Sequence, residues 1–476
     1  MEAATTSPTD APDFAAIATG LPPRPDLSRW MMSVGFMLTP TRFLDACQER
    51  CGDYFTLLPA PDRVLVVTAD PAAVKQVFTG DPDLLLAGEG NVVLAPILGS
   101  ASVLLLDGPE HLRQRRLLLP PFHGERVRAY AQLMERLMED EVRRWSPGET
   151  VAVLPVAQNL TIEVILQALL GVVDEPRRRR FRDAIDDTLF YPMGAARLRL
   201  SGRFTPRATP PRRVREALAF TSSLGTPAVM TYFPNLKGRT WWNVSTWRWW
   251  RHHDRLMAMV DEQIISTRTD PDLGERDDVL AMLVAEEIPE RDLREDLVTL
   301  IAAGHETTAA AIAWGAVLLA HHPKVRERAT AAAHEGDDRY LGALVKEVLR
   351  IRPPLPVAAG RTLDEPFVIG SHTVPARTPI LIDCWGLHHD PARHPDPERF
   401  DPGRFLTDGA ESYSWLPFGG GHRRCIGAAL AELEIKVALA TILRSVAIEP
   451  AERELPPTAR RGIVVVPHGG GRIRIG

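Results

Sequence analysis

The spacing of apolar and polar positions changes along the chain. The segment DRVLVVT, residues 62–68, has the β-branched density of a strand, and GDYFTLL just before it is the expected hairpin partner. From about residue 70 to about residue 350 the apolar spacing is helical, and strand-like segments return at residues 366–385 and 462–476. Much helix with scattered short strands, and no alternation of strand with helix, predicts a mainly α fold of the α+β class.

The longest helical pattern runs from about Asp292 to His321 without a proline, and Pro323 ends it. Thirty helical residues span roughly 45 Å, the length of a whole domain. Its flanks are apolar, but its centre, residues 303–308, reads AGHETT. Glycine and threonine are poor helix formers, and a carboxylate is costly to bury. A solvent-facing patch is one interpretation, but the apolar flanks favour a buried polar break with a function.

A second helical pattern runs from Tyr340 to Arg352, and Pro353 ends it. Its leucines and valines recur at the spacing of one buried helix face. Glu347 and Arg350 lie one turn apart, so their side chains can pair. Most such pairs are solvated and contribute little to stability, so the spacing alone leaves their role open.

A third helix is expected after Asp107, a plausible N-cap, with Pro109 in its first turn and its end near Pro120. His111 and Arg115 lie four residues apart and therefore share one face of this helix, whereas the other arginines point elsewhere.

Composition and charge narrow the class of protein. The chain has 476 residues and a net charge of −5, from 56 Lys and Arg against 61 Asp and Glu. This balance gives no electrostatic reason to expect nucleic acid as a partner. Four cysteines in so long a chain do not form a disulfide framework, and they favour a reducing cytoplasm.

The N-terminal residues 1–25 are rich in Ala, Thr, Ser and Pro and carry acidic residues where a signal peptide has basic ones, so we expect a flexible tail. The apolar stretch WMMSVGFML, residues 30–38, is far shorter than the roughly 20 residues that span a bilayer. We expect no transmembrane anchor, and a monomer in which residues 26–476 form a single domain.

The segment FGGGHRRCIG, residues 418–427, raises three interpretations of its cysteine. A structural cysteine would not need the glycines and arginines around it. A nucleophile would need a base such as His422, but the strand–turn–nucleophile pattern of hydrolases is absent. A thiolate ligand to iron explains the pattern best. Glycines let a flat cofactor approach, and a helix beginning at Cys425 directs its positive end at the sulfur. Arg423 can pair with a carboxylate of the cofactor, and Phe418 can shield the sulfur.

FGGGHRRCIG resembles the haem-binding signature of the cytochrome P-450 superfamily, the haem-thiolate monooxygenases. AGHETT resembles the family's oxygen-activation motif, and Glu347-Val-Leu-Arg350 resembles its Glu-x-x-Arg helix. Pro397-Glu-Arg-Phe400 is similar to the segment whose arginine joins that pair, and GPEHLRQRR is similar to the helix over the haem propionates. The resemblance implies a large helical domain with a long central helix and a small β-rich lobe, in a soluble member of bacterial type.

The same resemblance implies haem b as the cofactor and Cys425 as the axial ligand of its iron. It implies that Glu347, Arg350 and Arg399 form a buried charge triad. The other residues that it places at the haem are His111, Arg115, Arg361, Arg423, Phe418, Gly419, Gly427, Ala303 and Gly304. The residues expected to face the substrate are small or aliphatic, namely Val103, Ala303, Val357, Ala358 and Ile463, and they suggest a small lipophilic substrate.

Thr307 and Glu306 match the alcohol and the acid of the family's oxygen-activation motif. The alcohol can hold a water molecule near dioxygen, and the carboxylate can relay protons from solvent. Relatives that use peroxide directly usually lack this pair, so its presence favours a monooxygenase that draws electrons from NAD(P)H. A haem-thiolate sensor or carrier without enzymatic activity, or a peroxide-using variant, remains the alternative.

No flavin or ferredoxin module is visible in the sequence, so the resemblance implies a separate ferredoxin and ferredoxin reductase. Arg113, Arg116 and Arg424 are candidates for docking an acidic ferredoxin, but they fit equally well as ordinary solvated arginines. The tryptophan-rich segment 241–250 falls where the family has the roof of its substrate channel. It either packs helices together or lines an apolar entrance. The Arg- and Pro-rich segment 190–230 before it is longer than is usual in the family.

Overall fold

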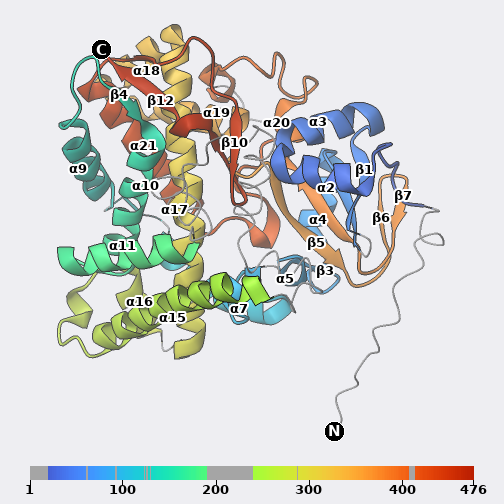
Figure 1. Ribbon diagram of the computed structural model, residues 1–476, viewed down its shortest axis with the longest axis horizontal. Helices are drawn as coiled ribbons and strands as arrows, with labels where there is room; N and C mark the ends of the chain where they lie inside the picture. Colours follow the sequence, from blue (N-terminus) through green and yellow to red (C-terminus); the bar gives the residue numbers. More distant parts are fainter. Residues whose placement is uncertain are drawn as a thin grey trace.

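The computed structural model describes residues 20–60, 63–91, 94–122, 124, 127–128, 130–189, 240–286, 288–406 and 413–476 (Figure 1). The segment 190–230 and most of the N-terminal tail discussed above lie outside these residues. For residues 240–249 only the helical backbone is described, so the role of the tryptophan-rich segment stays a prediction.

The longer helices are α2 (Arg29–Leu38), α3 (Pro40–Cys51), α4 (Pro71–Thr79), α7 (Gly108–Leu118), α9 (Ala131–Val142), α10 (Val153–Val164), α11 (Glu175–Leu189), α15 (Thr240–Arg268), α17 (Glu290–His321), α18 (Pro323–Glu335), α19 (Asp338–Ile351) and α21 (Ala428–Ser445). Shorter helices are α5 (Ala87–Gly90), α6 (Ala95–Leu98), α16 (Val279–Ala285) and α20 (Cys384–His389), and a π-helical turn, Ile165–Leu169, continues α10.

The β-rich lobe is built around one five-stranded sheet with the order β1-β2-β8-β5-β3. Its strands are β1 (Tyr54–Ala60), β2 (Arg63–Thr68), β3 (Leu85–Leu86), β5 (Val357–Leu363) and β8 (Pro379–Asp383). Strand β2 forms an antiparallel hairpin with β1 and pairs in parallel with β8. The beginning of the chain is therefore joined to a segment about 300 residues later, and α2 and α3 lie beside this sheet in Figure 1.

Three small sheets complete the β structure. They are the hairpins β6 (Phe367–Ile369)–β7 (His372–Val374) and β10 (Thr458–Arg461)–β11 (Val464–Pro467), and a sheet of β4 (Thr150–Ala152), β12 (Arg472–Ile475) and β9 (Ile448–Pro450). The predicted strands at residues 62–68, 366–385 and 462–476 are present, but β5 was not expected from its sequence VAAGRTL.

Helix α17 is the axis of the helical part and runs through its whole height in Figure 1. Its observed bounds differ from the prediction by two residues at the N-terminus. The first half buries residues such as Leu293 and Ile301 in a core shared with α15 and α16. The second half, from Ala309 to Ala320, is buried in a second core shared with α10, α19 and α21. Between the two cores, Ala303 is exposed, so the helix is open to solvent at its middle.

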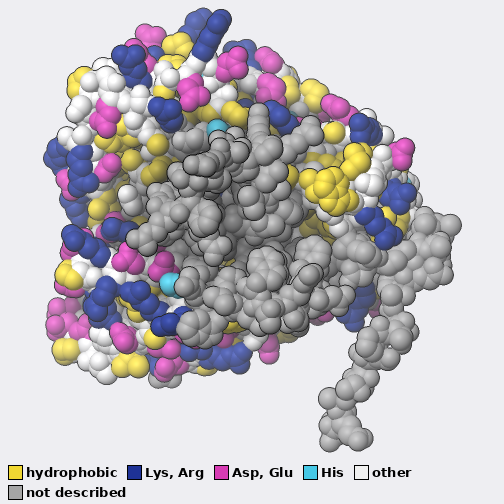
Figure 2. All heavy atoms as spheres, in the orientation of Figure 1, with side chains coloured by type: hydrophobic (Ala, Val, Ile, Leu, Met, Phe, Trp, Pro, Cys, Tyr) yellow, Lys and Arg dark blue, Asp and Glu magenta, His cyan; other side chains and the backbone are white. Residues whose placement is uncertain are grey.

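The described part of the surface carries charges of both signs. Figure 2 shows Lys and Arg side chains interspersed with Asp and Glu over the described part of one face, in line with the small net charge. Within the residues that the structure describes, no helix has the length and apolar character required to cross a membrane.

Candidate functional site

Cys425 lies in a short loop between a 3₁₀ turn, Gly421–Arg423, and helix α21. Its backbone N–H donates a hydrogen bond to the carbonyl oxygen of Phe418 at 2.9 Å, which closes the loop. The helix begins at Ala428, so the expectation that it begins at Cys425 itself was wrong by three residues. Gly427 is the N-cap, so the cysteine lies just before the first turn, where the positive end of the helix is still close.

Of the four cysteines, Cys425 is the one that is exposed. Enough protein surrounds its sulfur that burial raises the pKa of the thiol, so the sulfur faces a recess rather than the outer surface. The N–H of Gly427 and the charges of Arg115 and Arg424 lower this pKa. Burial is the larger effect, so the pKa of the free thiol is raised overall, and these three groups only partly offset the cost of forming the thiolate, the form that binds a metal.

The glycines before the cysteine have two different tasks. A Cβ at Gly421 would overlap the carbonyl oxygen of Phe78 in α4, and one at Gly420 would lie 2.9 Å from the Phe78 ring. These two glycines therefore allow contact with α4, rather than with a cofactor as the sequence suggested. A Cβ at Gly419 or Gly427 would meet no atom within 4 Å, so there is open space beside both.

A cluster of basic side chains lies beside this loop. His111 and Arg361 are each 2% exposed, and the Arg423 guanidinium pairs with Asp107 at 2.6 Å. Burial lowers the pKa of Arg361 and of Arg423 to about 10; the charge of Arg423 adds to the effect on Arg361, whereas Asp107 opposes the effect on Arg423. Burial, Arg423 and other neighbouring cations lower the pKa of His111 to about 3. Arg115 extends the cluster toward the cysteine, because its Nη2 donates to the carbonyl oxygen of the next-door Arg424 at 2.5 Å.

Asp107 occupies the N-cap position of α7, as predicted, but its side chain makes no capping hydrogen bond to that helix. Its Oδ1 accepts hydrogen bonds from the N–H groups of Ala87 and Gly88 at 2.9 and 2.8 Å, so it holds α5 instead. Its charge is thus shared between a helix N-terminus and Arg423. The basic cluster keeps an excess of positive charge and would stabilise anionic groups placed against it.

The centre of α17 presents an alcohol and an acid on different sides. The hydroxyl of Thr307 donates to the carbonyl oxygen of Ala303 at 2.8 Å, on the open part of the helix. The Glu306 carboxyl group is buried and accepts from Gln158 Nε2 at 2.5 Å. Burial raises its pKa, and the positive charge of Arg461, whose Nε lies 3.1 Å from Glu306 Oε1, opposes this rise. Nothing in the sequence pattern pointed to Gln158 or Arg461, because both come from distant elements.

The residues expected to face the substrate differ widely in solvent exposure. Ala303 is exposed and Gly304 is partly exposed, and a Cβ at Gly304 would lie 3.4 Å from Ile165. Val357 and Ala358 are partly buried in β5. Ile463 is 58% exposed at the turn of the β10–β11 hairpin.

The side chain of Val103 is 4% exposed and belongs to the hydrophobic core around the first half of α17, so its place at the substrate stays a prediction. Its backbone matters more than its side chain. The N–H of Val103 donates to Asp296 Oδ1 at 2.8 Å, and its carbonyl oxygen accepts from Arg423 Nη1 at 3.2 Å.

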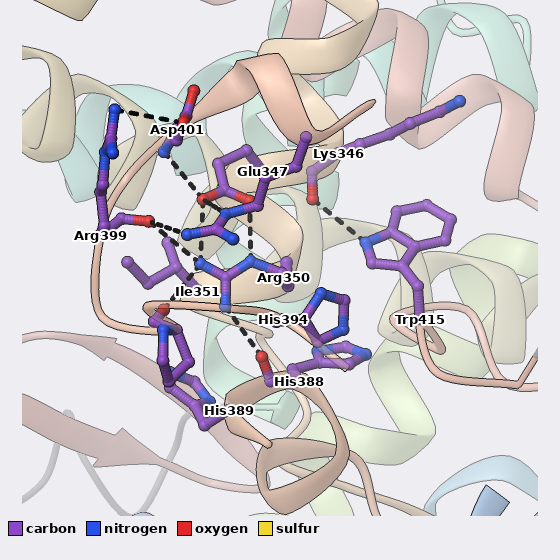
Figure 3. Close-up of polar contacts among 12 residues, drawn as sticks. Lys346, Glu347, Arg350, Ile351, His388, His389, His394, Arg399, Asp401 and Trp415 are labelled. Carbon is purple, nitrogen blue, oxygen red and sulfur yellow. Dashed lines mark hydrogen bonds and ion pairs between the residues drawn. The ribbon is translucent and has the colours of Figure 1, made fainter. Parts of the chain in front are cut away.

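The Glu347–Arg350 pair of α19 is fully buried, with Arg350 Nε 2.7 Å from Glu347 Oε2 (Figure 3). Arg399 is not the third member of the triad, contrary to the prediction. Figure 3 shows its side chain directed to Asp401, at 3.4 Å, and it is 65% exposed. The cation that reaches Glu347 is Arg404, whose Nε lies 3.4 Å from Glu347 Oε1 and whose side chain is 15% exposed.

The sequence contains the reason for this error. Pro397-Glu-Arg-Phe400 is followed after one residue by Pro402-Gly-Arg-Phe405, so two similar segments competed for one role. The second lies on a 3₁₀ turn, Pro402–Phe405, which packs against α19, and this places Arg404 rather than Arg399 over the pair.

Comparisons with known proteins agree with this geometry. The family model described as "Cytochrome P450" matches residues 213–474. A Mycobacterium tuberculosis protein named "Putative cytochrome P450 135B1" is 36% identical over 469 residues, which cover 96% of this chain and 91% of that protein. "Putative cytochrome P450 135A1" of the same organism is 33% identical, over 97% of this chain and 96% of that protein.

Two solved structures share the fold. The retinoic acid-bound cyanobacterial CYP120A1 gives a TM-score of 0.76 at 20% identity, over 96% of this chain and 99% of that one. CYP175A1 from Thermus thermophilus gives a TM-score of 0.68 at 22% identity, over 95% of this chain and 99% of that one.

Proposed function

The chain belongs to the cytochrome P450 family, and from this premise we propose that it inserts one oxygen atom from O₂ into a small lipophilic substrate, by hydroxylation or epoxidation. The family is one of haem-thiolate monooxygenases with a cysteine-ligated haem b. We propose further that electrons reach the haem from NAD(P)H through a separate redox partner. The family does not define which substrate is used.

The residues on either side of the site fit a haem. An accessible sulfur in a recess, open space beside Gly419 and Gly427, and a buried basic cluster match a flat group that carries an iron and two carboxylates. Cys425 would ligate the iron. His111, Arg115, Arg361 and Arg423 would hold the propionates, which supply the negative charge that the cluster lacks. When bound, the haem supplies oxygen activation, and a thiolate ligand favours cleavage of the O–O bond.

The observation that carries the proposal is the presence of a buried acid, Glu306, next in sequence to an alcohol, Thr307, at the solvent-open middle of α17. Thr307 donates its proton to the Ala303 carbonyl, so the lone pairs of its hydroxyl oxygen can accept a hydrogen bond from water. The raised pKa of Glu306 lets the carboxyl group hold a proton closer to neutral pH and then release it. A sensor or carrier needs no such proton source, and neither does an enzyme supplied with peroxide.

Three exposed arginines form the surface on which we propose that the redox partner docks. Arg113, Arg116 and Arg424 are exposed, and Arg424 is next to the cysteine in sequence. A ferredoxin with an acidic face, reduced by a ferredoxin reductase, would be attracted to such a group, and the attraction would weaken with salt. Charge reversal in Arg113→Glu should weaken ferredoxin binding, and an unchanged affinity would exclude this surface.

Two measurements test the function. The reduced protein with carbon monoxide should show the red-shifted Soret band of thiolate ligation, and Cys425→Ala should lose it. Survival of the band in that variant would remove the ligand assignment. Ligands that displace water from the iron should then be screened by the spectral shift, and the hits tested for product with NAD(P)H, ferredoxin and reductase. Absence of turnover with every electron donor, in protein with a normal carbon monoxide spectrum, would favour the sensor or carrier.

A further inference from the structure

The C-terminal hairpin β10–β11 reaches the centre of α17. Arg461, the last residue of β10, places its Nε 3.1 Å from Glu306 Oε1, although 155 positions separate the two in the chain. The side chains of Arg461 and Glu306 are only 20% and 7% exposed, so the ion pair is shielded from water. A shielded pair is screened much less by salt than a surface pair.

The two oxygen atoms of Glu306 have different surroundings. Oε1 accepts from Gln158 at 2.5 Å, pairs with Arg461, and lies 3.8 Å from His305 Nε2. Burial lowers the pKa of His305 to about 3, so this histidine is neutral, and its Nδ1 shares a hydrogen bond with Thr161 at 2.9 Å. Oε2 is buried and has no hydrogen-bond partner among the described residues. One oxygen is thus fixed in place while the other is available to exchange a proton.

A second carboxyl group interacts with the same arginine. Asp186 of α11 is accessible to solvent, and desolvation by the surrounding protein raises its pKa. Arg461 and then Arg182 oppose that rise, while Asp183 and Asp187 add to it. Asp186 also raises the pKa of Glu306. Arg461 therefore acts electrostatically on a solvent-accessible acid and on the buried acid of the oxygen-activation motif.

We propose that Arg461 is a positioning residue for proton delivery: its shielded ion pair with Glu306 Oε1 holds the Glu306 carboxyl group with Oε2 available for proton exchange. The guanidinium group stays protonated throughout and is not itself a relay. Glu306 loses one proton toward the site, and a proton from solvent replaces it. This inference rests on the proposed function, since only reductive oxygen activation consumes protons here.

The charge of Arg461 also helps the buried Glu306 carboxyl group to release its proton and take up another. Burial raises the pKa of Glu306, and an acid whose pKa rises too far releases its proton poorly. Arg461 is the largest of the influences that oppose this rise.

The test compares Arg461→Met with Arg461→Lys and with Arg460→Met as a matched control. Arg460 lies in the same hairpin, and its contacts include the carbonyl oxygens of Gly462 and Phe36. Infrared titration of the resting ferric protein, with Glu306→Gln to identify the protonated carboxyl band, should show this band persisting to higher pH in Arg461→Met. Arg461→Lys should restore most of the shift, and Arg460→Met should leave the titration unchanged.

With a substrate, Arg461→Met should lower product formed per NAD(P)H about tenfold, less than the roughly 10²–10⁴-fold contribution of a general acid, because Glu306 itself is still present. In Arg461→Met, the pH at which product formed per NAD(P)H changes should move to a higher value. In a Glu306→Gln background, Arg461→Met should cause no further loss of product per NAD(P)H. A carboxyl titration and a coupling profile like those of the wild type would overturn the proposal, as would an equal effect of Arg460→Met. Failure of the wild type to turn over would instead refute the proposed function and leave the infrared result to decide the role of Arg461.

Discussion

Replacing Arg404 by methionine should destabilise the protein far more than replacing Arg399 by methionine. Both guanidinium groups lie 3.4 Å from a carboxylate, Arg404 from Glu347 and Arg399 from Asp401. Burial separates the two cases, because the side chain of Arg404 is 15% exposed and that of Arg399 is 65% exposed. At an effective dielectric constant of about 20, a pair at this distance has a Coulomb energy of about 5 kcal/mol before desolvation is subtracted.

The net cost of losing Arg404 is smaller than this, because Glu347 keeps other partners. Its Oε1 still accepts from Arg350 Nη2 and from the N–H of Asp401, each at 2.9 Å. Arg404 also donates to the carbonyl oxygens of Pro395 and Asp396 at 2.5 and 2.6 Å, and these bonds are lost with it. We expect Arg404→Met to lower the free energy of unfolding by about 3 kcal/mol. An exposed pair such as Arg399–Asp401 contributes at most about 1 kcal/mol.

Urea unfolding of the ferric protein, followed by circular dichroism, measures both differences, and the Soret absorbance per protein reports haem retention. The two variants make the same chemical change and lie five residues apart, so each is the control of the other. Equal destabilisation by the two substitutions, or an Arg404→Met variant within about 0.5 kcal/mol of the wild type, would refute the assignment of Arg404 to the buried triad.

The other predictions concern a glycine and a buried acid. Gly421→Ala should prevent the native loop, because its φ is +62° and the new Cβ would overlap the Phe78 carbonyl oxygen, whereas the backbone of Gly427→Ala should fold normally. The soluble yield and circular dichroism of the two variants compare their folding, and equal folding would contradict the steric argument. Burial raises the pKa of Asp296 to about 7, so the folded state keeps a proton that the unfolded state loses above about pH 4. Asp296 should therefore lower stability by about 1.4 kcal/mol per pH unit between about pH 4 and 7, and in urea titrations Asp296→Asn should reduce the wild-type slope by this amount, while Asp383 and Glu434, whose pKa values burial also raises, keep their own contributions.

Local sequence patterns were enough to predict most of the helices and strands, but not which side chains contact each other across the fold. The absence of proline defined α17 and the Glu-x-x-Arg spacing identified a pair that is buried together, because both features act within a few residues. Arg404 was missed because two similar segments compete, and only packing against α19 distinguishes them. Arg461 was missed for a different reason: its contact with Glu306 depends on where a hairpin 155 residues away folds back, and no local spacing encodes that.

The loop of residues 99–107 shows how the two sides of the site are coupled. Its carbonyl groups at Val103 and Leu106 accept from Arg423, for which we propose a role at a haem propionate. On its other side Ser102 shares a hydrogen bond with Thr299 of α17 at 2.7 Å, and Val103 donates to Asp296. Because these contacts are buried, a shift of the loop would leave polar groups on both sides unpaired. The position of Arg423 and the position of α17 are therefore held by one segment, and haem binding should order that segment as well as the cysteine loop.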